Sequence, residues 1–268
     1  FYPDVWIEGG VESGGNYKKK VQKQQQTSAF SGKWPVSTGP LLYLWEDFQA
    51  ANQILEDSLL GFSQNGVVAK GNGIFNRFKE MSFRGDGFIA EFGTQKGYEK
   101  AKENDFLGIE FLFTPLVGKE QNGAILSYGG NQGLIIQKIG NQIFFQLMGA
   151  DKKSEVPETA FQFKTGKPVV LYVQLSGNNL RLFADGTPVF EKKLDGSIVQ
   201  KLENGELVFG SIEAEGSGIN GAISHVGLYG KNVSDEQVSH NSQAIHAVVA
   251  KRSEVKNLQL IGVLTELS

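Results

Sequence analysis

Apolar and polar residues alternate with a period of two in short segments along most of the chain. Between Phe106 and Phe113 four alternate positions are apolar, whereas Glu110 falls on the opposite face. The same period runs through residues 221–229, where it assigns one face to Ala222, Ser224, Val226 and Leu228. Such alternation predicts β-strands that bury one face and turn the other outward.

Residues 166–194, GKPVVLYVQLSGNNLRLFADGTPVFEKKL, combine three alternating segments with two sets of turn residues. We predict strands at Val169–Leu175, Leu180–Ala184 and Thr187–Leu194. Residues 176–179 join the first two, and Asp185-Gly186 joins the last two. Asn-Asn and Asp-Gly tolerate positive φ, which tight hairpins need in order to match the strand twist. The segment therefore predicts a three-stranded antiparallel meander.

Similar segments recur at intervals of about 8–12 residues and total about 13–15 strands. Leu41–Glu46 is apolar on both faces, so we predict a central strand there. Residues 93–104, GTQKGYEKAKEN, are charged and predict a surface loop. So many strands without alternating helices predict an all-β chain of two packed antiparallel sheets, a β-sandwich.

One short C-terminal helix is predicted after the last alternating segments. Ser234 occupies the N-cap position, Gln237 completes a capping box, and Val233 can pack on Val238 as a hydrophobic staple. We expect the helix to end near Ala247. The apolar residues of Leu258–Leu267 then predict a final strand, apolar on both faces and paired centrally.

The first 40 residues differ in composition from the rest. Residues 1–11 hold a strand candidate around Val5–Ile7, and residues 12–40 are rich in Lys, Gln, Gly and Ser. Such a stretch buries little apolar area, so we predict a flexible arm rather than a polyanion-binding patch. We therefore divide the chain into an N-terminal strand with its arm, 1–40, and a sandwich, 41–268. Trp34 either folds back onto the sandwich or is an exposed anchor.

Composition narrows the class of function. The net charge is −3, so no nucleic-acid partner is expected. No apolar run reaches the roughly 18–20 residues that span a bilayer, so no membrane insertion is expected. The chain has no Cys, which excludes disulfides, thiolate zinc sites and Cys nucleophiles. It begins at Phe1 rather than Met, so we expect a processed or trimmed product that could have lost a signal peptide.

Two C-terminal motifs carry a family resemblance. The run LYVQLSGNNLRLFADGTPVFEKKL, followed at residue 221 by GAISHVGLYGKNVSDEQVSHN, resembles the concanavalin A-like, laminin-G-like (LamG) family. The front half, LLYLWED and FKEMSFRGDGFIAEF, is similar to a bacterial branch of LamG-like modules found in large envelope proteins. The resemblance covers roughly residues 41–267. It implies a jelly-roll sandwich with a binding or adhesive role toward carbohydrate or protein, but it transfers no binding site.

The same fold houses glycosidases and lyases, so catalysis must be considered. Glycosidases of this fold carry acidic residues on one strand as E-x-D-x-x-E, which brings a nucleophile and an acid to the cleft. The nearest match starts at Glu103 and Asp105, but its third acidic position is Gly108. The strings that the lyases need are not present. We predict no catalytic residue and no enzyme; a carbohydrate-active enzyme with an unrecognised site remains an alternative.

Metal and ligand candidates are few. Glu213 and Glu215 can share a strand face and are weak calcium candidates, although a solvated strand end explains them as well. The turn explains Asp185 better than a metal does. Calcium, which is common in the LamG family, is the one cofactor considered.

The aromatic and His candidates complete the site prediction. Trp34 is the tentative ligand-binding residue, because an exposed ring stacks on sugars or anchors a protein interface. His225, His240 and His246 lack the i, i+4 spacing of a helical metal pair, so we interpret them as surface residues.

Three functions remain open. The favoured one is a non-catalytic binding or adhesion module that recognises a carbohydrate or protein surface and is secreted, periplasmic or at the cell surface (cell envelope). The second is a structural subunit that docks its N-terminal arm on a neighbouring copy, as a homo-oligomer or part of a larger complex. The third is the carbohydrate-active enzyme.

Overall fold

The computed structural model describes part of the chain. The described residues are 34–35, 41–45, 67–69, 74–75, 80–84, 88–90, 95–115, 122–128, 133–147, 158–162, 164, 166–202, 207–210 and 219–266. The chain forms two compact units, Phe1–Phe30 and Ser31–Ser268, and every described residue belongs to the second. The second unit begins ahead of the predicted boundary at residue 40. The predicted strand around Val5–Ile7 lies outside the described residues.

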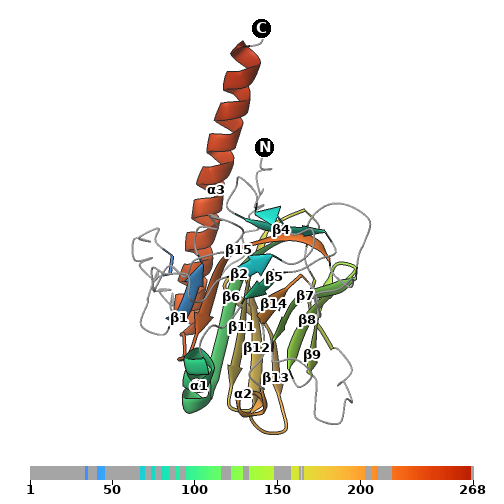
Figure 1. Cartoon of the computed structure of the whole chain (residues 1–268), viewed down its shortest axis with the longest axis vertical. Helices are drawn as coiled ribbons and strands as arrows, with labels where there is room; N and C mark the ends of the chain where they lie inside the picture. The colour runs from blue at the N-terminus through green and yellow to red at the C-terminus, as the bar shows by residue number, and fades with distance from the viewer. Residues whose placement is uncertain are drawn as a thin grey trace, which may run out of the picture. The chain divides into compact units, whose positions relative to one another are not determined.

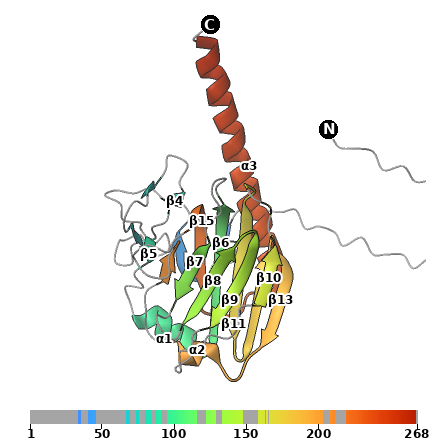
Figure 2. The same cartoon turned by 90° about the vertical axis from the view of Figure 1, so that its right-hand side faces the viewer.

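Two antiparallel sheets make up the second unit (Figures 1 and 2). Sheet A runs in the order β13 (Thr187–Lys193), β12 (Asn179–Ala184), β11 (Val169–Ser176), β6 (Phe106–Pro115), β15 (Asn220–Tyr229), β4 (Met81–Arg84) and β3 (Ile74–Phe75), and β1 (Leu41–Trp45) also pairs with β15. Sheet B runs in the order β10 (Glu158–Gln162), β9 (Gln142–Leu147), β8 (Leu134–Ile139), β7 (Gly123–Tyr128), β14 (Leu207–Phe209), β5 (Phe88–Ala90) and β2 (Val67–Ala69). The helices are α1 (Gln95–Asn104), α2 (Ile198–Lys201) and α3 (Asp235–Glu266).

The main core lies between the facing sides of the two sheets. Ile109 and Phe111 of β6 are fully buried there with Ile136 of β8 and Phe209 of β14. The rings of Phe111 and Phe209 meet edge to face with their centroids 6.2 Å apart, which joins sheet A to sheet B. The expected jelly-roll β-sandwich is confirmed.

The predicted meander is present as β11, β12 and β13. Val173 pairs with Leu182 across the first hairpin, and Leu182 pairs with Phe190 across the second. Asp185 and Gly186 form the second turn with φ of +49° and +77°. The turn residues therefore adopt the positive φ that the Asp-Gly sequence predicts.

Strand β15 departs from the predicted alternation. Its register against β6 shifts between Ser224 and Gly227, and His225 has a φ of +52°. This β-bulge moves the inward face by one position, so Ile223 joins Val226 in the main core. The single face predicted for positions 222, 224, 226 and 228 is therefore wrong ahead of the bulge.

Two predictions about helices are wrong. Residues 93–104 were expected to form a surface loop, but α1 occupies most of them and inserts Ala101 into the main core. Leu258–Leu267 was expected to form a strand, but α3 continues to Glu266. Residues 248–257 contain no Gly or Pro, so no residue there interrupts the helix, and apolar spacing in a short run fits either period. None of the helices within the described ranges is both long and apolar enough to cross a membrane.

Candidate functional site

The first part of α3 and Trp34 cover the face of sheet A that points away from the main core. In Figures 1 and 2, α3 starts beside sheet A and continues past the ends of its strands. The aromatic rings of Tyr172 and Tyr229 pack with Val238 of α3. Trp34 packs with Leu112 of β6 and, on α3, with buried Ala244 and Ile245. We call this covered side the outer face of sheet A.

A carboxylate lies inside this covered face. Glu110 is 0% exposed, and its Oε2 accepts hydrogen bonds from Trp34 Nε1 at 3.0 Å and from the hydroxyl of Tyr229. Asn241 Nδ2 of α3 donates to the same oxygen and to the Tyr229 hydroxyl, each at 3.0 Å. Among the described residues, the other oxygen, Oε1, has no hydrogen-bond partner, and neither has the buried hydroxyl of Tyr172. We call these side chains the Glu110 cluster.

Burial controls the ionisation of the cluster. Removal of Glu110 from water raises its pKa from 4.5 to about 7, although the hydrogen bonds from Tyr229, Trp34 and Asn241 oppose part of the rise. Burial also raises the pKa of Tyr172 and of Tyr229 well above 10, and the nearby Glu110 carboxylate raises both further. The two phenols are therefore neutral at physiological pH, whereas Glu110 titrates there.

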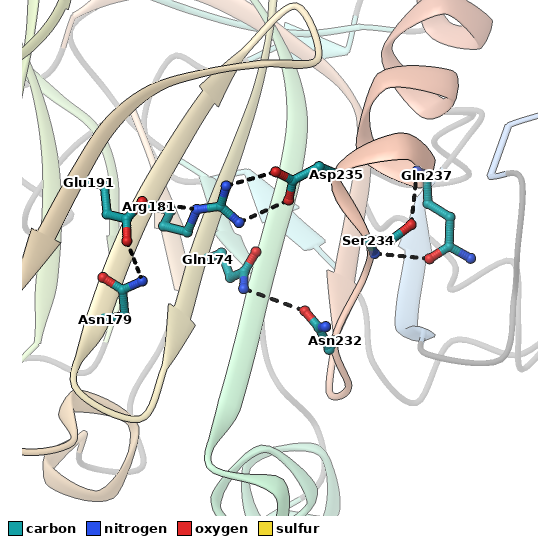
Figure 3. A network of polar contacts seen from close by, with 8 residues as sticks. All are labelled: Gln174, Asn179, Arg181, Glu191, Asn232, Ser234, Asp235 and Gln237. Atoms are coloured by element: carbon teal, nitrogen blue, oxygen red, sulfur yellow. Dashed lines mark hydrogen bonds and ion pairs between the residues drawn. The ribbon is translucent and has the colours of Figure 1, made fainter. Parts of the chain in front are cut away.

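A second group, the polar strip, lies at the start of α3 (Figure 3). Its members come from β11, β12 and β13, from the turn before α3 and from the first residue of α3: Gln174, Asn179, Arg181, Glu191, Asn232 and Asp235. Arg181 pairs directly with Gln174 on one side and Glu191 on the other, because these positions face each other across the strands. Pairing therefore creates a polar row that crosses three strands.

Arg181 is the centre of the polar strip. Its Nη1 and Nη2 each donate to one oxygen of Asp235 at 2.8 Å, and its guanidinium lies 4.6 Å from the centroid of the Phe183 ring. The hydrogen bonds to Asp235 raise the pKa of Arg181, and those from Arg181 lower the pKa of Asp235. The Arg181 side chain is 20% exposed and that of Asp235 is 56% exposed, so water weakens this pair.

The outer part of the polar strip faces solvent. Asn179 Nδ2 donates to Glu191 Oε1 at 2.9 Å, and the Glu191 side chain is 57% exposed. Gln174 Nε2 donates to Asn232 Oδ1 at 3.4 Å from a buried position. The strip thus presents the carboxylates of Glu191 and Asp235, each oriented by a hydrogen-bond donor from a neighbour, which is an arrangement suited to hydrogen bonding with hydroxyl groups of a ligand.

A third contact joins α3 to the Asp185-Gly186 turn between β12 and β13. His246 Nε2 donates to Asp185 Oδ1 at 2.7 Å, and the same oxygen accepts from the backbone N of Val170 at 2.9 Å. Partial burial acts to raise the pKa of Asp185, but the hydrogen bonds from His246 and Val170 outweigh it, so the pKa is lowered. A Cβ on Gly186 would lie 2.7 Å from Ser239 Cα, so the turn touches the backbone of α3. These contacts support the interpretation of Asp185 as a turn residue. Its side chain also binds His246 and so attaches the turn to α3.

The structure corrects two predicted site residues. Trp34 is 2% exposed, so it folds back onto the sandwich, and the exposed-anchor interpretation with its ligand-binding role is wrong. Its indole fills space between β6 and α3 because its N–H finds a buried carboxylate there. His225 was interpreted as a surface residue but is buried by the bulge, with its ring 5.4 Å from that of Trp34. Ser224 Oγ and His225 Nδ1 are hydrogen-bonded at 2.9 Å.

The remaining candidates stay apart from one another. Glu103 is at the end of α1, where it pairs with Lys100 at 2.9 Å. Asp105 follows it with a φ of +47° and accepts a hydrogen bond from Ser197. Glu213 and Glu215, the calcium candidates, lie outside the described residues. Within the parts of the chain that the structure describes, no three His, Cys, Asp or Glu side chains gather as a metal site.

The alternation places Glu110 on a strand face, but it does not predict that Glu110 is buried and accepts three hydrogen bonds. A signal was present, since Phe106 and Leu112 share that face and make both sides of the strand apolar. A charged residue on such a strand indicates that a second layer covers it. The partners Trp34, Tyr229 and Asn241 come from distant parts of the chain and carried no local signal.

Comparisons with solved structures find the same fold in botulinum neurotoxin binding domains. A structure of botulinum neurotoxin type C, whose cell entry is dependent upon interaction with two ganglioside molecules, matches with a TM-score of 0.59 and 15% identity, over 76% of this chain and 51% of that one. The binding domain of botulinum neurotoxin DC matches in its complex with SialylT (TM-score 0.59, 16% identity, 77% and 52% covered) and in its complex with rat synaptotagmin II (0.57, 15%, 76% and 51%). The chain thus spans about half the length of these domains.

Comparison with sequences is consistent with the fold. No curated protein matches the chain. A laminin-G family described as the concanavalin A-like lectin/glucanases superfamily matches residues 102–239, which is just over half of the chain. This range runs from the end of α1 to the first turn of α3 and includes the meander, the polar strip and Glu110. The chain therefore belongs to the laminin-G family of the concanavalin A-like lectin/glucanases superfamily.

Proposed function

We propose that the chain is a non-catalytic binding module that recognises a carbohydrate or protein surface, with carbohydrate as the first ligand class. Membership of a lectin-containing superfamily supports a binding role. The fold is also that of botulinum neurotoxin structures described with gangliosides, with SialylT and with rat synaptotagmin II. We further propose that it works outside the cytoplasm, as a secreted, periplasmic or cell-surface module. Fractionation of cells that express it tests this location.

The non-catalytic part rests on where the carboxyl groups lie. Retaining glycoside hydrolysis needs two carboxyl groups about 5–5.5 Å apart and open to substrate. The nearest sequence match splits between Glu103 on α1 and Asp105 in the turn, where each already has a partner. The carboxyl whose pKa of about 7 would suit proton transfer, Glu110, is sealed under Trp34 and α3. This burial is the observation that carries the proposal, because a general acid must reach its substrate.

The polar strip is the surface we assign to ligand binding. Asn179 holds the exposed Glu191 carboxylate by a hydrogen bond, so this carboxylate is oriented before a ligand arrives. Arg181 of β12, whose guanidinium lies over the Phe183 ring, also pairs with Glu191 at 3.7 Å. A second role of the strip, the attachment of α3 through Asp235, uses Arg181 and leaves Glu191 facing solvent.

A glycan array and a hydrolysis assay on the same glycans test the proposal, each with and without a chelator. We expect binding without product release, and about a tenfold loss of affinity, or about 1.4 kcal/mol, in either strip variant, because Glu191→Gln removes the charge of the acceptor and Asn179→Ala removes the hydrogen bond that orients it. Glu99→Gln changes an exposed carboxylate on α1 and is the matched control. Product release from any glycan would overturn the non-catalytic assignment. Unchanged binding in both strip variants would move the ligand to another face.

The alternative of a structural subunit is favoured by one observation. Trp34, which comes four residues after the end of the first compact unit at Phe30, is buried on the outer face of sheet A and donates to Glu110. Native mass measurement tests it. A stable oligomer that dissociates when residues 1–30 are removed would favour the subunit over the monomeric binding module.

A further inference from the structure

We propose that Glu110 is a pH-sensitive attachment point for Trp34 and helix α3 on sheet A, and that loss of its proton loosens both. We call this attachment, made by the hydrogen bonds of Trp34, Tyr229 and Asn241 to Glu110, the clasp. This inference does not depend on the ligand. It concerns the Glu110 cluster, none of whose members belongs to the polar strip, although Tyr172 lies 5.6 Å from the Phe183 ring that Arg181 contacts.

The geometry makes Glu110 a shared attachment point. Trp34 comes from the N-terminal segment, Tyr229 from the end of β15 and Asn241 from the second turn of α3, and all three donate to the same oxygen. The sequence separations from Glu110 are 76, 119 and 131 residues. Opening the outer face therefore breaks all these bonds together, so a change at this one carboxyl acts on the whole attachment.

Among the described residues, none of the groups that donate a hydrogen bond to Glu110 is a cation. Its three donors are an indole, a phenol and an amide, all neutral. The titratable groups that face the cluster are Tyr172 on β11 and Tyr229 and His225 on β15, and His225 contacts the ring of Trp34. On α3, Asp235 pairs with Arg181 and His246 with Asp185, whereas His240 lies next to Asn241 in sequence. Removing the charge from water is therefore only partly compensated.

The lack of a partner on Oε1 strengthens this inference. A carboxylate that is stable when buried has hydrogen bonds on both oxygens, yet here three donors meet Oε2 and none meets Oε1. The three hydrogen bonds on Oε2 lower the pKa of Glu110, but removal of the group from water outweighs them. Ionisation in the closed clasp therefore leaves a buried charge with one oxygen that no donor among the described residues satisfies.

The direction of the pH response follows from linkage. In the closed clasp the pKa of Glu110 is about 7, and in the open clasp, where water reaches the carboxyl, it returns to 4.5. The open form therefore binds fewer protons, and its population rises with pH, by about 70-fold between pH 5 and pH 8. Asp185 and Asp235 have lowered pKa values, so they act only in more acidic solution and in the opposite direction.

Hydrogen exchange measured by NMR on the full chain tests the clasp. The chain has three Trp, so three indole N–H signals are expected, and Trp34→Phe identifies that of Trp34. Opening constants for this N–H and for the amides of residues 239–249 are measured from pH 5 to pH 8 and corrected for the base-catalysed intrinsic rate. We expect the 70-fold rise in the wild type, less than a twofold change in Glu110→Gln, and the full rise in the matched control Glu103→Gln, which alters an exposed carboxylate.

Three results would overturn the proposal. The first is an opening constant that does not depend on pH in the wild type, and the second is a rise that persists in Glu110→Gln. The third is an equal rise at the amides of β8, on the other sheet, because that pattern indicates global unfolding rather than release of the outer face.

Discussion

Gly186, at the tip of the hairpin under α3, is a sensitive position for testing how the helix is attached. We consider Gly186→Ala together with Gly140→Ala as its matched control. Both glycines occupy hairpin turns at positive φ, +77° for Gly186 and +57° for Gly140. A Cβ at Gly140 would meet nothing within 4 Å, whereas at Gly186 it would lie 2.7 Å from the backbone Cα of Ser239. The pair therefore separates the cost of backbone conformation from the cost of contact with α3.

The magnitudes can be estimated separately. An alanine at positive φ costs about 1–2 kcal/mol, and reduced freedom of the unfolded chain returns about 0.4–1 kcal/mol. Gly140→Ala should therefore lower the free energy of unfolding by about 1 kcal/mol. Gly186→Ala carries the same cost and adds overpacking against a helix backbone, about 1–3 kcal/mol. We expect a total of about 2–4 kcal/mol for Gly186→Ala.

Urea unfolding of both variants, followed by tryptophan fluorescence, measures these costs at one pH. Hydrogen exchange at the amides of residues 239–249 should also accelerate in Gly186→Ala and not in Gly140→Ala. Equal costs in the two variants, within about 0.5 kcal/mol, would show that the hairpin tip does not press on α3. The attachment through His246 and Asp185 would then need to be reconsidered.

Three further predictions concern the cap, the arm and the buried acid. Ser234→Ala should cost about 1 kcal/mol, measured by urea unfolding, because its hydroxyl accepts from the backbone N of Gln237 at 3.2 Å; an unchanged midpoint would place the helix start elsewhere. Deletion of residues 12–33 should leave a cooperative melt, whereas Trp34→Ala should cost about 3–5 kcal/mol; a deletion as damaging as Trp34→Ala would make the arm part of the core. The folded-state pKa of Glu110 lies above 4.5, so this group's contribution to stability is fully present below pH 4.5 and falls as the pH rises toward and through 7. Urea titrations should give a wild type that loses about 2.5 kcal/mol more than Glu110→Gln between pH 5 and pH 8, and parallel curves would contradict the pKa.

Local sequence predicted several features correctly. Asp185-Gly186 forms the predicted tight turn, and the Ser234–Gln237 capping box is present, with Gln237 Oε1 accepting from Ser234 N at 3.0 Å. The inward face predicted for β6 and the alternation through the meander are also confirmed, whereas the face of β6 that carries Glu110 is buried rather than exposed. Each of these depends on residues within a few positions of one another, so the sequence contains the whole interaction.

Helix α1, the bulge in β15 and the length of α3 were predicted wrongly from local patterns. The charged residues of α1 suggested a loop, but burial of Ala101 in the core stabilises a helix there. His225 lies in a bulge that exists only where β15 pairs with β6, so alternation could not place it. The length of α3 was underestimated because a short apolar run carries either period.

The sequence by itself determined that the chain is a turn-rich antiparallel sandwich, because period-two alternation and turn residues act over a few positions. Tertiary structure alone decided that the outer face of sheet A has a second layer. Trp34, Glu110 and Asn241 are separated by 76 and 131 residues along the chain, and each taken alone resembles an ordinary arm, strand or helix residue. Only packing brings the indole and amide donors to one carboxyl and removes water from it. Burial, which no local pattern encodes, is what moves the pKa of Glu110 to about 7.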